Sequence, residues 1–453
     1  MNRLASTVVV LGLLASAARA EDSLQYGLIP KGHLLMPEGK PGAVIVLASD
    51  AGGWTAADEA AAQSFRAEGA AVIGIDMPAL LQAVRASEDD CVYIMGDIEE
   101  LSHEIQRGAG TTSYAAPILA GAGAGGALVL DLVAQLPDAT SAGAIAVDPL
   151  DGLPLARELC TEAEETALDG RRVYGLQAGA LAAPVSVIFT PAATATGRAH
   201  VAAIAADHPD VERSDTPLSA PEALAQAVRD RLGTLAGAED PLGLPLTVLD
   251  ATPRHDTVAL VWSGDGGWRD IDMEISKVFQ AEGVPVVGLD SLRYFWSERT
   301  PEETARDLER MIDAYRARWH VKHVLLAGYS FGADVLPAAY NALPEADKAA
   351  VRQISLLALS QEVTYEVSVG GWLGLPGDGS KSPVRDIRKI DPSLVQCIYG
   401  TEEEGDDPCP TLKDAGVEVI PIEGGHHFDG DYKALAEKVL AGLTRRLGSR
   451  SGG

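Results

Sequence analysis

The strongest constraint on the fold of this 453-residue chain is an internal duplication. The segment AVIVLASDAGGW (43–54) returns as TVALVWSGDGGW (257–268), at an offset of 214 residues. The same offset relates two further pairs of segments, FRAEG with FQAEG (65–69 and 279–283) and VIGID with VVGLD (72–76 and 286–290). A period this long indicates two homologous domains and excludes a solenoid of repeats of about 20–50 residues.

Each half alternates short, β-branched apolar segments with longer helical patterns. In the second half this pattern predicts strands at 258–262, 284–289 and 323–327 and helices at 272–282 and 302–319. Strands that alternate with helices imply βαβ units and a mainly parallel sheet. We therefore predict two tandem α/β domains, residues 21–238 and 239–453.

The first 20 residues are typical of a secretory signal peptide. Arg3 precedes a short apolar run (8–14), and Ala18-Arg19-Ala20 fits the small-x-small cleavage rule. The run is too short to span about 30 Å of hydrocarbon. We expect cleavage after Ala20, export to the periplasm, and no transmembrane segment in the mature chain.

Charge and cysteine content narrow the function classes further. A formal net charge of −29 repels phosphate backbones, so we expect no nucleic-acid partner, and it attracts cationic ligands. An exported protein meets an oxidising compartment, and pairing within each half gives Cys91–Cys160 and Cys397–Cys409. Metal-site spacings such as CxxC do not accompany these cysteines, and we expect neither a metal nor a cofactor.

A nucleophile motif lies in the second half. Gly328-Tyr329-Ser330-Phe331-Gly332 is a G-x-S-x-G between an apolar strand (324–327) and a helical segment (333–343), the strand–turn–helix context of a nucleophile elbow. In the first half, Gly123 stands where Ser330 stands. The fold class that follows is a pair of α/β-hydrolase-like domains, the first lacking the nucleophile. We interpret His208 in the first half as a surface residue without a catalytic role.

A serine hydroxyl needs an adjacent base, and in this fold class the chain order is Ser, acid, His. The segment GGHHFDG (424–430) follows a predicted strand and supplies two candidate bases, of which we favour His426 over His427. Carboxylates follow the preceding strand (394–400). We favour Glu403 as the acid, with Asp406 and Asp407 as open alternatives.

An oxyanion hole needs backbone N–H donors aimed at the developing charge. The N–H of Phe331, directly after the nucleophile, is the first expected donor. The second should come from the glycine-rich loop 263–268, where Gly264 and Asp265 are the candidates.

Several segments of the second half resemble the AcvB/VirJ family of periplasmic virulence-associated proteins. They are SGDGGW (263–268), SLRYFWSERTPEETARDL (291–308), AGYSFGADVLPAAYN (327–341), QCIYG (396–400) and GGHHFDGDY (424–432). The two-unit length resembles the longer AcvB type. The resemblance implies an α/β-hydrolase fold and hydrolysis of aminoacylated phosphatidylglycerol, with release of lysine or alanine.

That substrate carries an ammonium group, an ester carbonyl and a phosphate. We expect Asp334, one helical turn after Ser330, to bind the ammonium. Arg293 is the candidate for the phosphate, and Trp268 is a further substrate-binding candidate. Two other interpretations stay open: a different periplasmic serine esterase or lipase, and a non-catalytic scaffold of a secretion system. The intact order of serine, acid and histidine argues against the scaffold.

Overall fold

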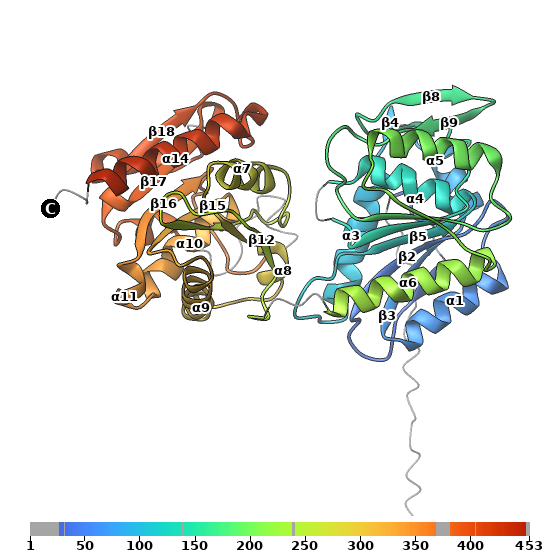
Figure 1. Ribbon diagram of the computed structural model, residues 1–453, viewed down its shortest axis with the longest axis horizontal. Coiled ribbons are helices and arrows are strands. Elements are labelled where there is room, and N and C mark those ends of the chain that lie inside the picture. The colour runs from blue at the N-terminus through green and yellow to red at the C-terminus, as the bar shows by residue number, and fades with distance from the viewer. Residues whose placement is uncertain are drawn as a thin grey trace, which may run out of the picture.

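The computed structural model describes residues 27–30, 32–137, 140–237, 241–367, 381–403 and 405–449. The predicted signal peptide (1–20) and the domain boundary at 238–239 lie outside these residues. Within them the chain forms two units, each built on one seven-stranded sheet (Figure 1).

The first unit has helices on both faces of its sheet. Its main-sheet strands are β1 (His33–Leu35), β2 (Ala43–Ala48), β3 (Ala70–Ile75), β5 (Ile118–Ala122), β6 (Gly143–Val147), β10 (Val185–Phe189) and β11 (Glu212–Asp215). Its helices are α1 (Ala56–Ala67), α2 (Met77–Ala86), α3 (Ile94–Gly108), α4 (Ala124–Gln135), α5 (Ala195–Asp207) and α6 (Ala220–Gly237). Four short strands form two small ribbons: β4 (Cys91–Val92) with β7 (Glu158–Leu159), and β8 (Glu165–Leu168) with β9 (Arg171–Tyr174).

The second unit repeats this plan. Its strands are β12 (Leu246–Leu249), β13 (Thr257–Trp262), β14 (Val286–Leu289), β15 (His323–Tyr329), β16 (Val351–Leu357), β17 (Val395–Gly400) and β18 (Glu418–Ile422). Its α-helices are α7 (Asp270–Ala281), α8 (Ser291–Tyr294), α9 (Pro301–Trp319), α10 (Phe331–Ala342), α11 (Glu345–Lys348), α13 (Pro383–Ile387) and α14 (Tyr432–Ser449). Short 3₁₀ turns are η1 (Pro392–Leu394), η2 (Thr401–Glu403), η3 (Cys409–Ala415) and η4 (Phe428–Gly430).

The two sheets have the same topology. Their strand orders are β1-β3-β2-β5-β6-β10-β11 and β12-β14-β13-β15-β16-β17-β18, which match position by position. In each sheet the first strand is antiparallel to its neighbour and the remaining pairs are parallel. The predicted fold class, two tandem α/β-hydrolase-like units with mainly parallel sheets, is confirmed.

Carboxyl ends of parallel strands meet at one edge of a sheet, and the predicted site residues follow three such ends. Ser330 follows β15, Glu403 ends the turn after β17, and His426 follows β18. The parallel sheet therefore brings these side chains together although they lie up to 96 residues apart in the sequence.

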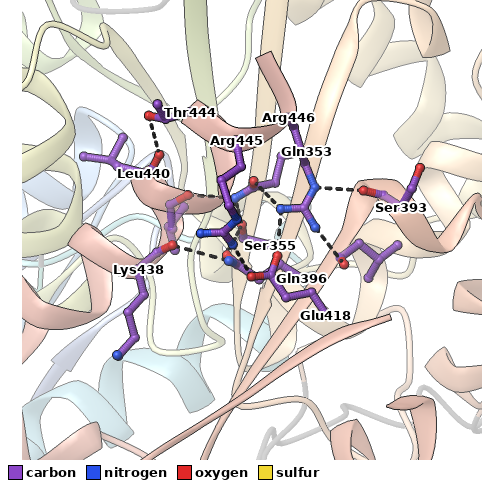
Figure 2. A network of polar contacts seen from close by, with 12 residues as sticks. Gln353, Ser355, Ser393, Gln396, Glu418, Lys438, Leu440, Thr444, Arg445 and Arg446 are labelled. Atoms are coloured by element: carbon purple, nitrogen blue, oxygen red, sulfur yellow. Dashed lines mark hydrogen bonds and ion pairs between the residues drawn. The ribbon is translucent and has the colours of Figure 1, made fainter. Parts of the chain in front are cut away.

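Helix α14, which follows the His426 loop, is tied to the sheet by a buried polar network (Figure 2). The Arg446 guanidinium donates to Gln353 Oε1 at 2.9 Å and to the carbonyl of Val395 at 3.2 Å. Gln353 Nε2 in turn donates to Ser355 Oγ and to the Val439 carbonyl of α14. Strands β16 and β17 thus fix the helix whose preceding loop carries the histidine.

Both expected disulfides are present, Cys91–Cys160 in the first unit and Cys397–Cys409 in the second. The second one joins the interior of β17 to η3 and closes the loop that contains Glu403. Among the described residues, no helix is both long and apolar enough to cross a membrane.

One expectation about the first unit is wrong. His208 does not lie at the surface but is only 4% exposed, at the C-terminal cap of α5. It also precedes β11, whereas His426 follows the equivalent strand β18. The reason is local: the helix ends at this residue, and its imidazole turns inward as the chain enters the strand.

Candidate active site

The turn after β15 holds Ser330 in a strained backbone conformation. Its φ of 49° and ψ of −120° lie where residues with a side chain are rarely found. The flanking glycines make this turn possible, because a Cβ on Gly328 would overlap the backbone of Gly332, and one on Gly332 would overlap the carbonyls of Trp262 and Ser263. The turn places the serine side chain at the N-terminus of α10, above the sheet.

Three side chains meet in a line at this turn. His426 Nε2 lies 2.9 Å from Ser330 Oγ, and His426 Nδ1 lies 3.0 Å from Glu403 Oε2. The His426 and Glu403 side chains are each about one-third exposed, so solvent reaches the line. A backbone bond from Glu402 N to the Gly424 carbonyl at 3.0 Å joins the acid loop to the histidine loop.

Two of the alternatives left open by the sequence, His427 and Asp407, make other contacts. His427 Nδ1 is 3.3 Å from the Tyr329 hydroxyl, and that hydroxyl donates to the His426 carbonyl. Asp407 is buried and accepts from the backbone N–H groups of Leu359 and Cys409 at 3.0 and 2.7 Å. Burial raises the pKa of Asp407 to about 6. Both residues therefore hold the loops around the site in place.

The loop after β13 lies beside the serine. A Cβ on Gly264 would lie 3.7 Å from Ser330 Cβ. Hydrogen bonds of Ser263 fix the start of this loop: its Oγ donates to the Gly264 carbonyl and accepts from Ser291 N at 2.9 Å. Asp265 follows in the same loop, and burial raises the pKa of its carboxyl group. Hydrogen bonds from the backbone N–H groups of Asp265 itself and of Gly266, and the nearby charge of Arg269, oppose this rise.

In the first unit, a side chain occupies the position that corresponds to the expected oxyanion hole. Asp50, the counterpart of Gly264, places its Oδ1 2.7 Å from Ala51 N and 2.8 Å from Ala124 N. Ala51 aligns with Asp265 by the 214-residue offset, and Ala124 follows Gly123 as Phe331 follows Ser330. A carboxylate oxygen is thus bound by two N–H groups that correspond to those of Phe331 and of Asp265, one of the two candidates for the second donor.

Position 123 keeps the elbow geometry without a side chain. Gly123 has φ 57° and ψ −117°, close to the values of Ser330, and it precedes α4 as the serine precedes α10. The sheet, the sharp turn and the helix of the first unit are therefore retained around a residue that cannot act as a nucleophile.

The three residues expected to contact the substrate already have partners within the protein. Asp334 is 4% exposed, and its Oδ1 accepts from Ser360 N at 2.8 Å, so an ammonium group would have to displace that donor. Trp268 packs its indole against Gly288 within the core, which gives it a packing role. Arg293 Nε lies 3.4 Å from Asp290 Oδ2, and Arg293 lines a cavity of about 720 Å³ between the units.

Two charged residues at the unit interface escaped sequence reasoning. Arg269 of the second unit and Glu99 of the first lie 3.6 Å apart, next to the loop that carries Asp265. No spacing rule pairs residues that are this distant in sequence. The available signal was the position of Arg269 directly after the repeated motif that ends in Trp268.

Part of the second unit matches a known protein family. Residues 256–447 match the family described as "Bacterial virulence protein (VirJ)". No curated protein sequence matches the chain.

Solved structures of α/β hydrolases are also similar to it. Est1E from Butyrivibrio proteoclasticus with bound ferulic acid is 13% identical, with 46% of this chain and 98% of that chain covered and a TM-score of 0.32. The α/β hydrolase GrgF from Penicillium sp. sh18 is 14% identical, with coverages of 44% and 93% and a TM-score of 0.33. XC6422 from Xanthomonas campestris, a serine hydrolase without a lid, is 18% identical, with coverages of 46% and 91% and a TM-score of 0.30.

Proposed function

Residues 256–447 form a VirJ-like α/β-hydrolase unit, and on this premise we propose that the protein is a serine carboxylic-ester hydrolase. The observation that carries the proposal is the continuous line of contacts from Ser330 Oγ through His426 to Glu403, at 2.9 and 3.0 Å. Nucleophile, base and orienting acid within hydrogen-bond reach of one another are what covalent serine catalysis requires.

In the first half-reaction, Ser330 Oγ attacks the ester carbonyl carbon while His426 Nε2 takes the hydroxyl proton. Glu403 accepts from Nδ1–H, which fixes the imidazole tautomer and stabilises the imidazolium that forms. The carbonyl oxygen becomes an oxyanion and is bound by the N–H groups of Phe331 and Asp265. The bound Asp50 carboxylate of the first unit supports this choice of donors, since its oxygen occupies the equivalent position.

Collapse of this intermediate breaks the bond to the leaving alcohol, which receives the proton from His426. Water then attacks the acyl-serine with His426 again acting as the base, and the carboxylic acid and free Ser330 are regenerated. Because the site is open to solvent, water for this second step is at hand.

For the substrate, we propose aminoacylated phosphatidylglycerol, such as the lysyl or alanyl ester, cleaved in the periplasm after removal of the signal peptide. The family resemblance and the net charge of −29, which favours cationic ligands, support this choice. Asp334 is enclosed and already accepts from Ser360 N, so we propose that Asp265, directly after the Gly264 that lies beside Ser330, takes the α-ammonium in its place. Arg293 remains the proposed phosphate contact.

A fluorophosphonate probe tests the chemistry. The full-length protein should be labelled, and Ser330→Ala should abolish labelling, whereas the control Ser214→Ala, at an exposed serine of β11, should leave it unchanged. Labelling that persists in Ser330→Ala would contradict a catalytic role for Ser330, and an unlabelled wild type would favour the scaffold interpretation.

Vesicles test the substrate. Phosphatidylglycerol vesicles containing lysyl- or alanyl-phosphatidylglycerol should release free amino acid with the wild type and not with Ser330→Ala. If the wild type cleaves simple esters but releases no amino acid from these vesicles, the protein is a serine esterase with a different substrate.

A further inference from the structure

Helix α3 of the first unit faces the edge of the second unit that carries α8 (Figure 1). At the end of α3, the Arg107 guanidinium lies 3.9 Å from the centre of the Trp296 ring and donates to the carbonyls of Trp296 and Val367. The Trp296 indole N–H donates to Thr111 Oγ1 at 2.9 Å. The first unit is therefore joined to the second by specific polar and cation–π contacts.

The residue before Trp296 packs directly against the nucleophile turn. Trp296 is preceded by Phe295, whose ring packs edge-on against that of Phe331 with the centroids 5.1 Å apart. Phe331 is the residue whose N–H is the first proposed oxyanion donor. One side of the catalytic turn is thus packed on a segment that the first unit holds.

An ion pair between the units lies next to the other proposed oxyanion donor, the N–H of Asp265. Glu99 Oε1 lies 3.6 Å from Arg269 Nη1, and the two side chains are only 12% and 22% exposed. The Arg269 guanidinium lies against Gly266, where a Cβ would meet it, and its charge acts on Asp265. The ion pair therefore ends on the loop that supplies the second donor.

Burial raises the pKa of Glu99, and the nearby charge of Arg269 opposes that rise. His103 Nε2 is 4.0 Å from Glu99 Oε1, but burial, aided by Arg107 and Arg269, lowers the pKa of His103 to about 3. The imidazole is consequently neutral at physiological pH, so among the described residues Arg269 is the charged group that pairs with Glu99.

We infer that Glu99 of the first unit is a positioning residue for ester hydrolysis in the second: through Arg269 it holds the loop 264–268 against Ser330. This inference rests on the proposed function. It also gives the unit without a nucleophile a defined part in the reaction, since the loop it steadies carries an oxyanion donor.

The need for such a support follows from the composition of the loop. Three of its five residues are glycines, which have little intrinsic conformational preference, so external contacts must fix the direction of the Asp265 N–H. An oxyanion donor acts only when it is already in place as the charge develops. Misplacement of about 1 Å can cost about 100-fold in rate.

The test compares Glu99→Gln with a matched control in the full-length protein. The rate of fluorophosphonate labelling and the kcat for a small neutral ester should fall at least about 10-fold, with KM within about twofold of wild type. Glu68→Gln removes a comparable carboxylate from an ion pair with Arg229, on the first unit's surface, and should leave both rates unchanged. All measurements are made well below the melting temperature of each variant.

A double-mutant cycle separates positioning from a general loss of stability. Arg269→Gln should lower the rates as much as Glu99→Gln, and the double variant should show no further loss, because the two residues act through one contact. Additive losses, or a wild-type rate in Glu99→Gln, would overturn the inference while labelling of the wild type still supported the proposed function. An unlabelled wild type would overturn both.

Discussion

Asp50 Oδ1 accepts a hydrogen bond from Ala124 N at 2.8 Å, so the first unit binds its own carboxylate at the start of the helix that follows its elbow. The second unit has Gly264 at the position of Asp50, and the corresponding N–H of Phe331 has no side chain of this loop residue to bind. The two units therefore differ at two positions: Gly123 stands where Ser330 stands, and Asp50 of the first unit places its carboxylate on the N–H groups of Ala51 and Ala124.

This relationship predicts what happens when the aspartate of the first unit is introduced at the equivalent position of the second. Gly264→Asp should place a carboxylate on the N–H groups of Phe331 and Asp265 and lower kcat by about 100-fold or more, as loss of an oxyanion hole does. Gly264→Ala is the control, because the nearest atoms to a Cβ there, in the Tyr329 ring and Ser330 Cβ, lie at 3.4–3.7 Å, which is ordinary contact. Ester hydrolysis by the two purified variants measures the difference. Equal losses would mean that the position is sensitive to bulk and not to charge.

The acid assignment makes a second prediction. Glu403→Gln should keep the fold, because the side chain lies in a half-open turn, but should lower kcat by about 100-fold or more through loss of the imidazole's orienting acceptor. Asp407→Asn should instead act mainly on stability, since its carboxylate accepts two backbone N–H groups away from the histidine. Measuring the activity and the thermal melting of both variants shows which carboxylate is the catalytic acid. A catalytic loss confined to Asp407→Asn would reverse the assignment.

The duplication carried most of the fold prediction. An offset shared by three motifs required two domains of one kind, and the alternation of strands and helices required parallel sheets, which the matching strand orders confirm. The elbow was readable because the strain at Ser330 demands small neighbours at fixed positions, Gly328 and Gly332. Local chemistry with a strict steric requirement leaves a pattern in the sequence.

What the sequence concealed depends on side-chain burial and on contacts between units. Asp334 has the right helical spacing to face a ligand, but its carboxylate accepts from Ser360 on the following loop. Trp268 belongs to a repeated motif because it packs on Gly288, and the repeat reflects that packing. The pair of Glu99 and Arg269 depends on how the two units dock, which no local pattern encodes.

Asp334 predicts a pH dependence of stability. Burial raises its pKa from 3.8 to about 7, with Asp407 and Asp265 adding to the effect. Between about pH 4 and 7 the folded protein therefore holds a proton that the unfolded chain has released, so this group's contribution to stability is greatest below pH 4 and is lost as pH rises to 7. Asp334→Asn, which cannot ionise, should flatten that slope, and urea unfolding at several pH values measures it. An unchanged slope would show that the carboxyl group is already ionised at low pH.

The network beneath the His426 loop gives the last prediction, with two neighbouring arginines as test and control. Arg446 is 14% exposed, and it bonds Gln353 and the carbonyls of Val395 and Ser393 and pairs with Glu418 at 2.8 Å. Arg446→Met would remove the guanidinium donors from Gln353 and from the two backbone carbonyls, at a cost of about 2–4 kcal/mol in the free energy of unfolding, whereas Glu418 would keep its contact with Arg445.

Arg445 pairs with the same Glu418 carboxylate but is 58% exposed, so Arg445→Met should cost at most about 1 kcal/mol. Chemical denaturation of the two variants measures the difference. Since α14 follows the histidine loop, Arg446→Met should also lower the rate of fluorophosphonate labelling in the folded protein, and Arg445→Met should not. Equal destabilisation by both substitutions would mean that the charge of Glu418, rather than the buried acceptors, is what the network needs.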